Sequence, residues 1–68
     1  MVEECKKQVL VPIAEGFEEI ETVAIINILR RAGVEVTVAS IMGKEMPLTL
    51  KGSNGISLMA DCYYEDCD

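Results

Sequence analysis

The sequence contains no histidine, and this absence removes several kinds of chemistry. Without histidine the chain has no imidazole general base, no Ser–His or Cys–His dyad and no imidazole ligand for a metal. Basic residues are also scarce, because six Lys and Arg stand against twelve Asp and Glu, which gives a net charge of −6. A basic surface for nucleic acid is therefore not expected, and charge repulsion disfavours anionic membrane surfaces.

Long apolar segments are absent as well. No run of about 18 apolar residues occurs, so the sequence predicts no transmembrane helix. Residues 1–7 include Glu3 and Glu4 and lead into no long apolar stretch, so we expect no secretory signal. Half of the 68 residues are nevertheless hydrophobic, which is too large a fraction for a disordered acidic tail. We therefore expect one small domain, or a piece of one, with a small core.

Cysteine occurs three times, at Cys5, Cys62 and Cys67. An odd number cannot form a closed set of disulfides within one chain, and nothing else in the sequence indicates secretion. We therefore expect a reducing cytoplasm, with the cysteines of the tail as ordinary thiols. Cys62 and Cys67 are five residues apart but have no second pair of ligands beside them, so no metal site is predicted.

The first half of the chain predicts a strand, a helix and a second strand. The apolar run over residues 8–13 is typical of a parallel strand that is covered on both faces. Apolar residues then recur three and four positions apart from about Glu18 to Ala32, which predicts a helix that Gly33 ends. Its apolar face is wide enough to contact the sheet on one side and a partner subunit on another. A β-branched strand over residues 34–40 completes a parallel β-α-β unit.

The second half predicts a short hairpin and an acidic tail. Two short strands at residues 48–50 and 56–59 flank the turn signal Asn-Gly at 54–55. The tail, residues 61–68, carries no pattern of a strand or helix. Because these elements leave part of a parallel sheet uncovered, we expect residues 1–68 to be the N-terminal third of a larger α/β domain.

Two segments resemble the ThiJ/PfpI superfamily, in the branch of the parkinsonism-associated protein and its ThiJ/YajL-type bacterial relatives. The first covers residues 9–23 and contains the turn Gly-Phe-Glu-Glu-Ile-Glu. The second covers residues 29–40 and contains the helix end Leu-Arg-Arg-Ala-Gly. Residues 52–61 fit the pattern less tightly, and the resemblance as a whole extends over residues 7–66.

The resemblance implies a flavodoxin-like sandwich with a parallel sheet, usually homodimeric, whose complete domain is more than twice as long. It places the reactive cysteine on a nucleophile elbow further along the chain, so that none of the three cysteines here is the nucleophile. One catalytic residue carries over, Glu21, which in relatives points at the cysteine sulfur and shares a proton with it. Gly16 is expected to allow the turn and to let backbone N–H groups approach a substrate. Glu18 and Glu19 are expected to face solvent or an interface.

The expected place of Glu21 agrees with general rules for α/β proteins. The turn at Gly16 delivers the helix start to the carboxyl end of the first strand, where open α/β sheets place their sites. Burial at such a position favours the protonated carboxyl, which donates a hydrogen bond to a thiolate.

Three hypotheses about function follow, and the sequence leaves them open. The first is a cofactor-independent cysteine enzyme of the glyoxalase III type, which converts methylglyoxal or glyoxal to the hydroxy acid, or the related protein deglycase. The second is a non-enzymatic oxidative-stress sensor or redox-regulated chaperone, whose oxidised cysteine is held by Glu21. The third is an inactive truncated or cleaved fragment whose partner is the remainder of its own domain. None of the three requires a metal or cofactor.

Overall fold

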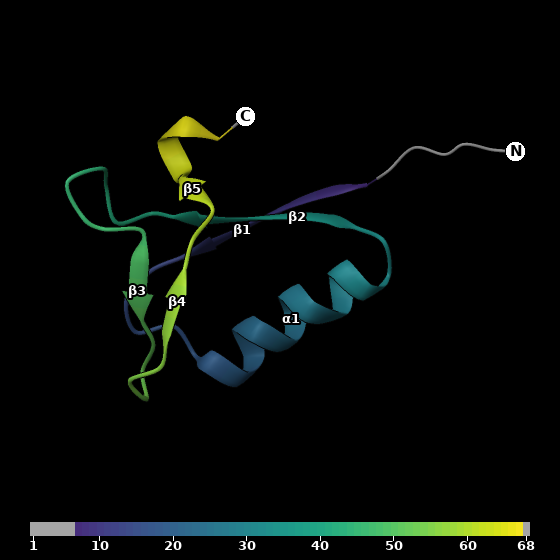
Figure 1. Ribbon diagram of the computed structural model, residues 1–68, viewed down its shortest axis with the longest axis horizontal. Helices are drawn as coiled ribbons and strands as arrows, with labels where there is room; N and C mark the ends of the chain where they lie inside the picture. Colours follow the sequence, from purple (N-terminus) through teal and green to yellow (C-terminus); the bar gives the residue numbers. More distant parts are fainter. Residues whose placement is uncertain (1–6, 68) are drawn as a thin grey trace, which may run out of the picture.

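The structure is a computed structural model that describes residues 7–67, and a parallel β-α-β unit forms its larger part (Figure 1). Strands β1 (Gln8–Ile13) and β2 (Glu35–Ser40) are parallel and pair along their whole lengths. Helix α1 (Glu19–Arg31) connects them. These bounds confirm the predicted order and agree with the expected ones to within one residue at each end.

Helix α1 packs on one face of the two strands. Its inward side chains Ile26 and Leu29 join a core with Val36 and Val38 of β2, whose side chains alternate toward the helix. Arg30, in the last turn, donates a 2.9 Å hydrogen bond from Nη2 to the carbonyl of Val36. The helix end is therefore fixed to the strand that follows it.

A short antiparallel hairpin stands at the carboxyl end of β1 and β2 (Figure 1). It consists of β3 (Thr49–Lys51) and β4 (Ser57–Met59), joined by the predicted Asn-Gly turn. Leu50 of β3 is 1% exposed and belongs to the same core as α1 and β2. The hairpin is thus part of the core and closes the end of the β-α-β unit.

The tail contains a strand that the sequence pattern did not indicate. Strand β5 (Cys62–Tyr63) pairs in parallel with Ala39 and Ser40 of β2, and the 3₁₀ turn η1 (Tyr64–Asp66) follows it. Asp61 directs the chain there, because its Oδ2 accepts from the Val38 amide at 2.8 Å and its own amide donates to the Val38 carbonyl at 2.7 Å. Two residues are too few for an alternating pattern, so only this long-range contact reveals the strand.

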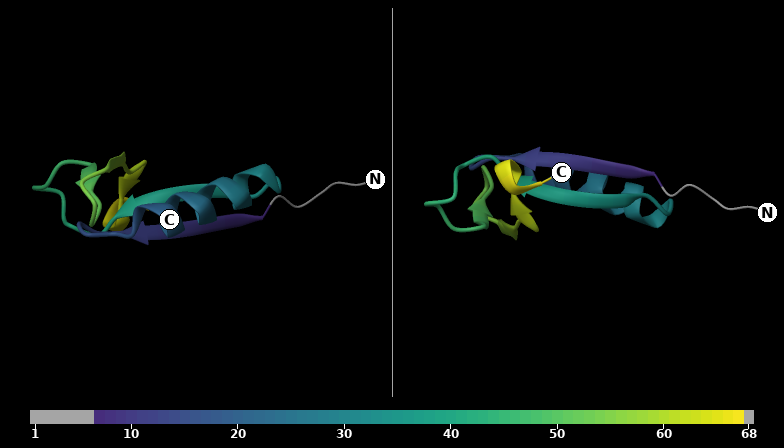
Figure 2. Two further views of the ribbon diagram at one scale, coloured as in Figure 1. Left: turned by 90° about the horizontal axis from the view of Figure 1, so that it is seen from below. Right: turned by 90° about the horizontal axis from the view of Figure 1, so that it is seen from above.

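The three-stranded sheet of β1, β2 and β5 forms one layer, and α1 is the one helix that packs on it among the described residues. Figure 2 shows α1 running alongside β1 and β2, with the hairpin and the C-terminal turn gathered at one end. The shortest principal axis measures 11 Å, close to the spacing of about 10 Å between two packed layers. The face of the sheet away from α1 therefore carries no second layer from residues 7–67. Within the same residues, no helix has both the length and the apolar character needed to cross a bilayer.

Candidate functional site

The turn after β1 brings the predicted site residues to the carboxyl end of the strand. Gly16 adopts φ 88°, in the left-handed region that favours glycine, and its amide donates a 2.8 Å hydrogen bond to the carbonyl of Lys51. In return, the Lys51 amide donates to Oε2 of Glu15 at 2.9 Å. The turn is therefore tied to β3, and the Gly16 amide is already occupied. A substrate-binding role for Gly16 stays a prediction.

Glu18 is the N-cap of α1. Its backbone is extended, and its Oε1 accepts a 2.8 Å hydrogen bond from the amide of Glu21. This contact satisfies one of the free N–H groups at the helix start. The side chain is exposed, as predicted, and its role in the described structure is to begin the helix.

Glu21 lies in the first turn of α1 and is exposed. Ile25 and Ile28 follow it at the spacing that places side chains on one side of a helix, and both are themselves more than half exposed. The two described cysteines, Cys62 and Cys67, lie elsewhere, against strands β1 and β2. Within residues 7–67 the structure therefore gives Glu21 no cysteine partner, and its catalytic role stays a prediction.

The prediction for Glu19 is wrong, because this residue is buried rather than turned to solvent or an interface, with 4% of its surface exposed. Its Oε2 accepts from the backbone amides of Asn54 at 2.7 Å and of Ile56 at 3.2 Å. Its Oε1 accepts from the Asn54 side-chain amide at 3.1 Å and from the Ser53 hydroxyl at 3.4 Å. We call this arrangement, formed by Glu19, Ser53, Asn54 and Ile56, the Glu19 clasp. No local pattern signals it, since its halves lie about half the chain apart.

The clasp keeps its carboxylate charged. Burial by itself raises the pKa of Glu19, but hydrogen bonds donated by its own amide, by Asn54 and by Ile56 outweigh burial, so the pKa lies below its ordinary value of 4.5. A carboxyl held in the ionised form is a poor proton donor near neutral pH. The electrostatics of Glu19 therefore suit a structural tie and do not suit acid catalysis.

Gly52 leaves room for the clasp. A Cβ atom built on this glycine would overlap the carboxylate of Glu19. The amide of Gly52 also donates to the Ile56 carbonyl at 2.8 Å, which closes the hairpin turn. The absence of a side chain at position 52 thus lets the turn approach the start of α1 closely.

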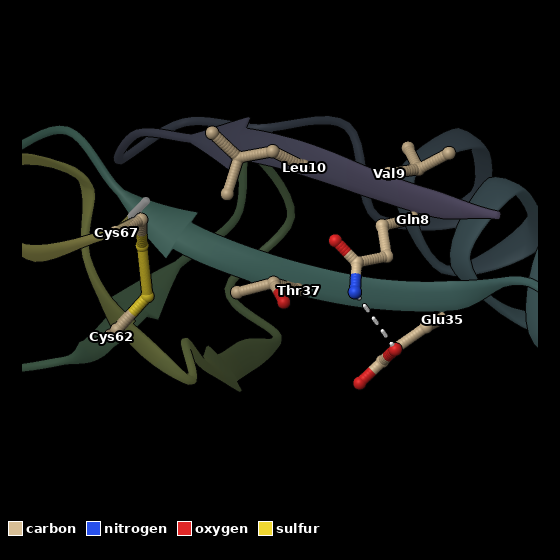
Figure 3. Close-up of a pocket in the computed structure, with 7 residues that line it drawn as sticks. All are labelled: Gln8, Val9, Leu10, Glu35, Thr37, Cys62 and Cys67. Carbon is tan, nitrogen blue, oxygen red and sulfur yellow. Dashed lines mark hydrogen bonds between the residues drawn. A yellow bond between two sulfur atoms is a disulfide. The ribbon is translucent and has the colours of Figure 1, made fainter. Parts of the chain in front are cut away.

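A second candidate region is an open hollow of about 380 Å³ beside the sheet (Figure 3). Strand β1 contributes Gln8 and Leu10, strand β2 contributes Thr37, and the disulfide between Cys62 and Cys67 borders the other end. The prediction of ordinary thiols, which rested on the odd number of cysteines and on the lack of any sign of secretion, is wrong for Cys62 and Cys67. The fold brings them together, because β5 and η1 turn the chain back on itself. Cys5 lies outside the described residues.

Metal binding has no ready set of ligands in the part of the chain that the structure describes. No three Cys, Asp or Glu side chains among residues 7–67 lie close enough together to hold an ion.

Comparison with known proteins gives a consistent result. The profile of the DJ-1/PfpI family matches residues 7–68. The chain is 45% identical over 60 residues to protein DJ-1 homolog A of Arabidopsis thaliana and 42% identical over 60 residues to the Parkinson disease protein 7 homolog of Danio rerio. Each match covers 88% of this chain, but only 14% of the Arabidopsis protein and 30% of the Danio protein.

Solved structures agree with the sequence matches. The crystal structure of the VC2308 protein superposes with a TM-score of 0.83 at 44% identity, covering 94% of this chain and 31% of that one. An oxidized form of Toxoplasma gondii DJ-1 gives a TM-score of 0.77 at 46% identity, covering 84% and 29%. The predicted flavodoxin-like fold class is thereby confirmed for the N-terminal portion that these residues represent. The chain belongs to the DJ-1/PfpI family.

Proposed function

We propose that the complete protein is a stress-response enzyme that needs no cofactor and uses a cysteine from outside this chain to convert a small 2-oxoaldehyde, methylglyoxal or glyoxal, to its hydroxy acid. Glu21 is its proton donor and acceptor, and removal of sugar-derived adducts from proteins is the related deglycase form of the same chemistry. The observation that supports this is the place of Glu21, at the first turn of α1 and the carboxyl end of β1.

The surroundings of Glu21 support a buried role in the complete domain. Ile25 and Ile28 are 52% and 62% exposed on its side of the helix. Apolar surface that remains in contact with water forgoes the free energy that its burial would give. A layer that packs on these side chains lies next to Glu21. A carboxyl at this position can form a hydrogen bond with a thiolate that such a layer brings beside it.

The proposed reaction needs no external oxidant. The thiolate attacks the aldehyde carbon to form a hemithioacetal, and Glu21 carries a proton from that carbon to the neighbouring one, which leaves a thioester. Water then hydrolyses the thioester, breaking the carbon–sulfur bond and releasing the hydroxy acid and the cysteine thiol. Overall one water is added to the 2-oxoaldehyde, while its aldehyde carbon is oxidised and its ketone or second aldehyde carbon is reduced. Oxidation and reduction balance within one substrate molecule, so the proposed reaction needs no redox cofactor.

A redox sensor or chaperone is the second candidate function. The same glutamate would hold a cysteine oxidation product by a hydrogen bond. An observation that favours it is the match to a Toxoplasma gondii DJ-1 that is described as oxidized.

We also propose that the complete protein is a homodimer in which α1 contributes to the interface. Ile20 is 78% exposed at the start of the helix, and Ile56 and Met59 of the hairpin are similarly open. Apolar side chains this exposed on neighbouring elements are typical of surfaces that a second protein copy covers. The net charge of −6 supports the expectation that nucleic acid and anionic membranes are not partners.

The function is tested by the variant Glu21→Gln in the complete protein, expressed from its full-length gene and purified. We expect the turnover of methylglyoxal to fall by about 10²-fold or more, the usual contribution of a positioned acid or base. The matched control is Glu45→Gln, which changes an exposed glutamate in the loop after β2 and should leave turnover unchanged. Turnover that survives in Glu21→Gln would refute the catalytic role. A wild-type protein without turnover, but with a cysteine that oxidises more readily than in Glu21→Gln, would favour the sensor.

Two measurements test the relation of this chain to the complete domain: intact mass under denaturing conditions, and aldehyde turnover by the chain alone. The purified 68-residue chain alone is expected to convert no aldehyde, because residues 7–67 bring no thiol to Glu21. A second, larger species that co-purifies would mean that the cysteine is supplied by a separate chain. Turnover by the 68-residue chain alone would contradict the proposal that its nucleophile lies elsewhere.

A further inference from the structure

The disulfide between Cys62 and Cys67 is a feature that the proposed function does not use. It joins the first residue of β5 to the residue after η1 and borders the hollow beside the sheet (Figure 3). We propose that Cys62 and Cys67 are a reversible dithiol–disulfide pair that exchanges with thiols of the glutathione class and thereby fastens or releases the η1 turn. The proposal does not depend on Glu21.

The position of the pair allows exchange. Both cysteines are half-buried, and among residues 7–67 both line a hollow that is open along β1 and β2. They belong to the two-residue strand β5 and to the residue after η1, so no long strand has to separate for a small thiol to reach them. Thiol–disulfide exchange requires such access to one of the sulfurs.

The short spacing between the two cysteines limits how much the disulfide stabilises the fold. A disulfide stabilises a fold mainly by closing a loop in the unfolded chain, and the gain grows with loop length. Cys62 and Cys67 are separated by five positions, so the loop that they close is short. The bond therefore adds less to global stability than a disulfide that closes a long loop, and its effect is concentrated on the turn between the two cysteines.

The turn depends on the disulfide because its other contacts are few. Cys62 is anchored by pairing with Ala39 of β2. At the other end, the Cys67 amide donates to the Tyr64 carbonyl at 3.1 Å, and Asp66 forms an exposed ion pair of 2.9 Å with Lys44. Exposed ion pairs contribute little to stability. The Tyr63 hydroxyl donates to the Met46 carbonyl at 2.6 Å and holds the start of the segment. Beyond Tyr63, reduction leaves η1 with one backbone hydrogen bond, a contact of 3.2 Å between the Cys67 sulfur and the Tyr63 carbonyl, and a weak ion pair, and we expect it to open.

The chemistry balances with glutathione disulfide as the oxidant. The thiolate of one cysteine attacks a sulfur of glutathione disulfide, forming a mixed disulfide and releasing one glutathione thiolate, which takes up a proton. The second cysteine then attacks the mixed disulfide as a thiolate, forms the Cys62–Cys67 bond and releases the second glutathione. Two protein thiols are oxidised and one glutathione disulfide is reduced to two thiols. An excess of reduced glutathione reverses both steps.

The test measures this equilibrium in the complete protein with Cys5→Ser, and digestion after the acid quench isolates the peptides that carry Cys62 and Cys67, so that only the proposed pair is read out. Samples are equilibrated at a series of ratios of reduced to oxidised glutathione and quenched with acid. Mass spectrometry then measures the fraction of each species. We expect a reversible change between the dithiol and a species lighter by two hydrogen atoms, with little glutathione adduct. The equilibrium constant for oxidation should be at least about tenfold larger in native buffer than in urea, because the fold holds the two sulfurs together.

Three outcomes of this titration would overturn the proposal. They are a pair that stays oxidised in a large excess of reduced glutathione, a pair that never closes in excess oxidised glutathione, and equal constants with and without urea. Cys62→Ser serves as the control for the mechanism, because Cys67 should then accumulate the mixed disulfide instead of resolving it.

The release of the turn is measured separately by amide hydrogen exchange. Reduction should abolish the protection of the Cys67 amide and leave the amide of Leu50, in the core strand β3, as protected as before. Unchanged protection at Cys67 would contradict the fastening of η1.

Discussion

The backbone amide of Asn54 and the Oε2 of Glu19 meet at 2.7 Å across 35 positions of sequence. This hydrogen bond is the shortest of the Glu19 clasp and joins the hairpin turn to the first turn of α1. Glu21, two residues further along the same helix, is therefore positioned by a contact that lies outside its own element. The clasp provides a rigid base for the end of the fold where the site is proposed.

Glu19→Gln should make the protein less stable and also change how stability depends on pH. Because the clasp holds the pKa of Glu19 below 4.5, its charge stabilises the fold above that pH, and the contribution is lost as the pH falls through the lower folded-state pKa. Glutamine offers a single oxygen, so one half of the clasp loses its acceptor. We expect the urea midpoint of Glu19→Gln to lie below the wild type at about pH 7 and to approach it as the pH falls well below 4.5. Parallel curves over this range would contradict the assignment, and Glu45→Gln is the exposed control.

Gly52→Ala should destabilise the protein by about 1–3 kcal/mol, the usual cost of forcing a methyl group into occupied space. The added Cβ overlaps the Glu19 carboxylate, which must then leave its hydrogen bonds. The cost should be much smaller when Glu19→Ala has already removed the carboxylate. Urea denaturation of both single variants and the double variant measures this coupling, and strictly additive effects would show that the two residues do not interact.

Leu50→Ala should cost about 2–5 kcal/mol, which is a large part of the net stability of about 5–15 kcal/mol that is typical of a domain. Leu50 is 1% exposed and joins the hairpin to the core of α1 and β2. Ser57→Ala, at an exposed position of the partner strand β4, should change stability by no more than about 0.5 kcal/mol. Circular dichroism during thermal unfolding compares the two. Similar melting temperatures for both variants would mean that the hairpin does not pack on the core.

Asp61→Ala should release β5 from β2 at a cost of about 1–3 kcal/mol, because the Val38 amide loses its acceptor. Asp61→Asn keeps an oxygen at the same place and should retain most of the protection of that amide. The charge itself contributes little, since the ion pair with Arg30 is about half exposed and 3.4 Å long. Hydrogen exchange at Val38 distinguishes the two variants. Full protection in Asp61→Ala would contradict the role of Asp61 in starting β5.

The sequence was a reliable guide where the signal is local and repeated. Apolar spacing located α1 to within one residue at each end, and the β-branched runs located β1 and β2. The Asn-Gly pair located the hairpin turn. Each of these elements carries its own pattern, because every turn of a helix or pair of strand residues must bury the same face. The Glu-Glu-Ile-Glu and Leu-Arg-Arg-Ala-Gly segments likewise carried the family resemblance.

Glu19 and Glu21 show where local patterns become insufficient. Both are glutamates in the first turn of one helix. This position alone gives both the same interpretation, namely acidic side chains that interact favourably with the positive end of the helix dipole. One is buried and bound by four donors from the hairpin turn, and the other is exposed beside uncovered isoleucines. The difference depends on what packs against each side of the helix, which the helix sequence does not encode.

The amino-acid sequence by itself determined the order of the main elements, the fold class, the family and the charge that argues against nucleic acid as a partner. These depend on residue type and on short-range spacing. Only the tertiary structure decided that Glu19 is a buried clasp, that Gly52 must lack a side chain, that Asp61 starts a third strand and that Cys62 bonds to Cys67. Each of these follows from the way β2 and the hairpin bring separate segments together, and such contacts leave no periodic trace in the chain.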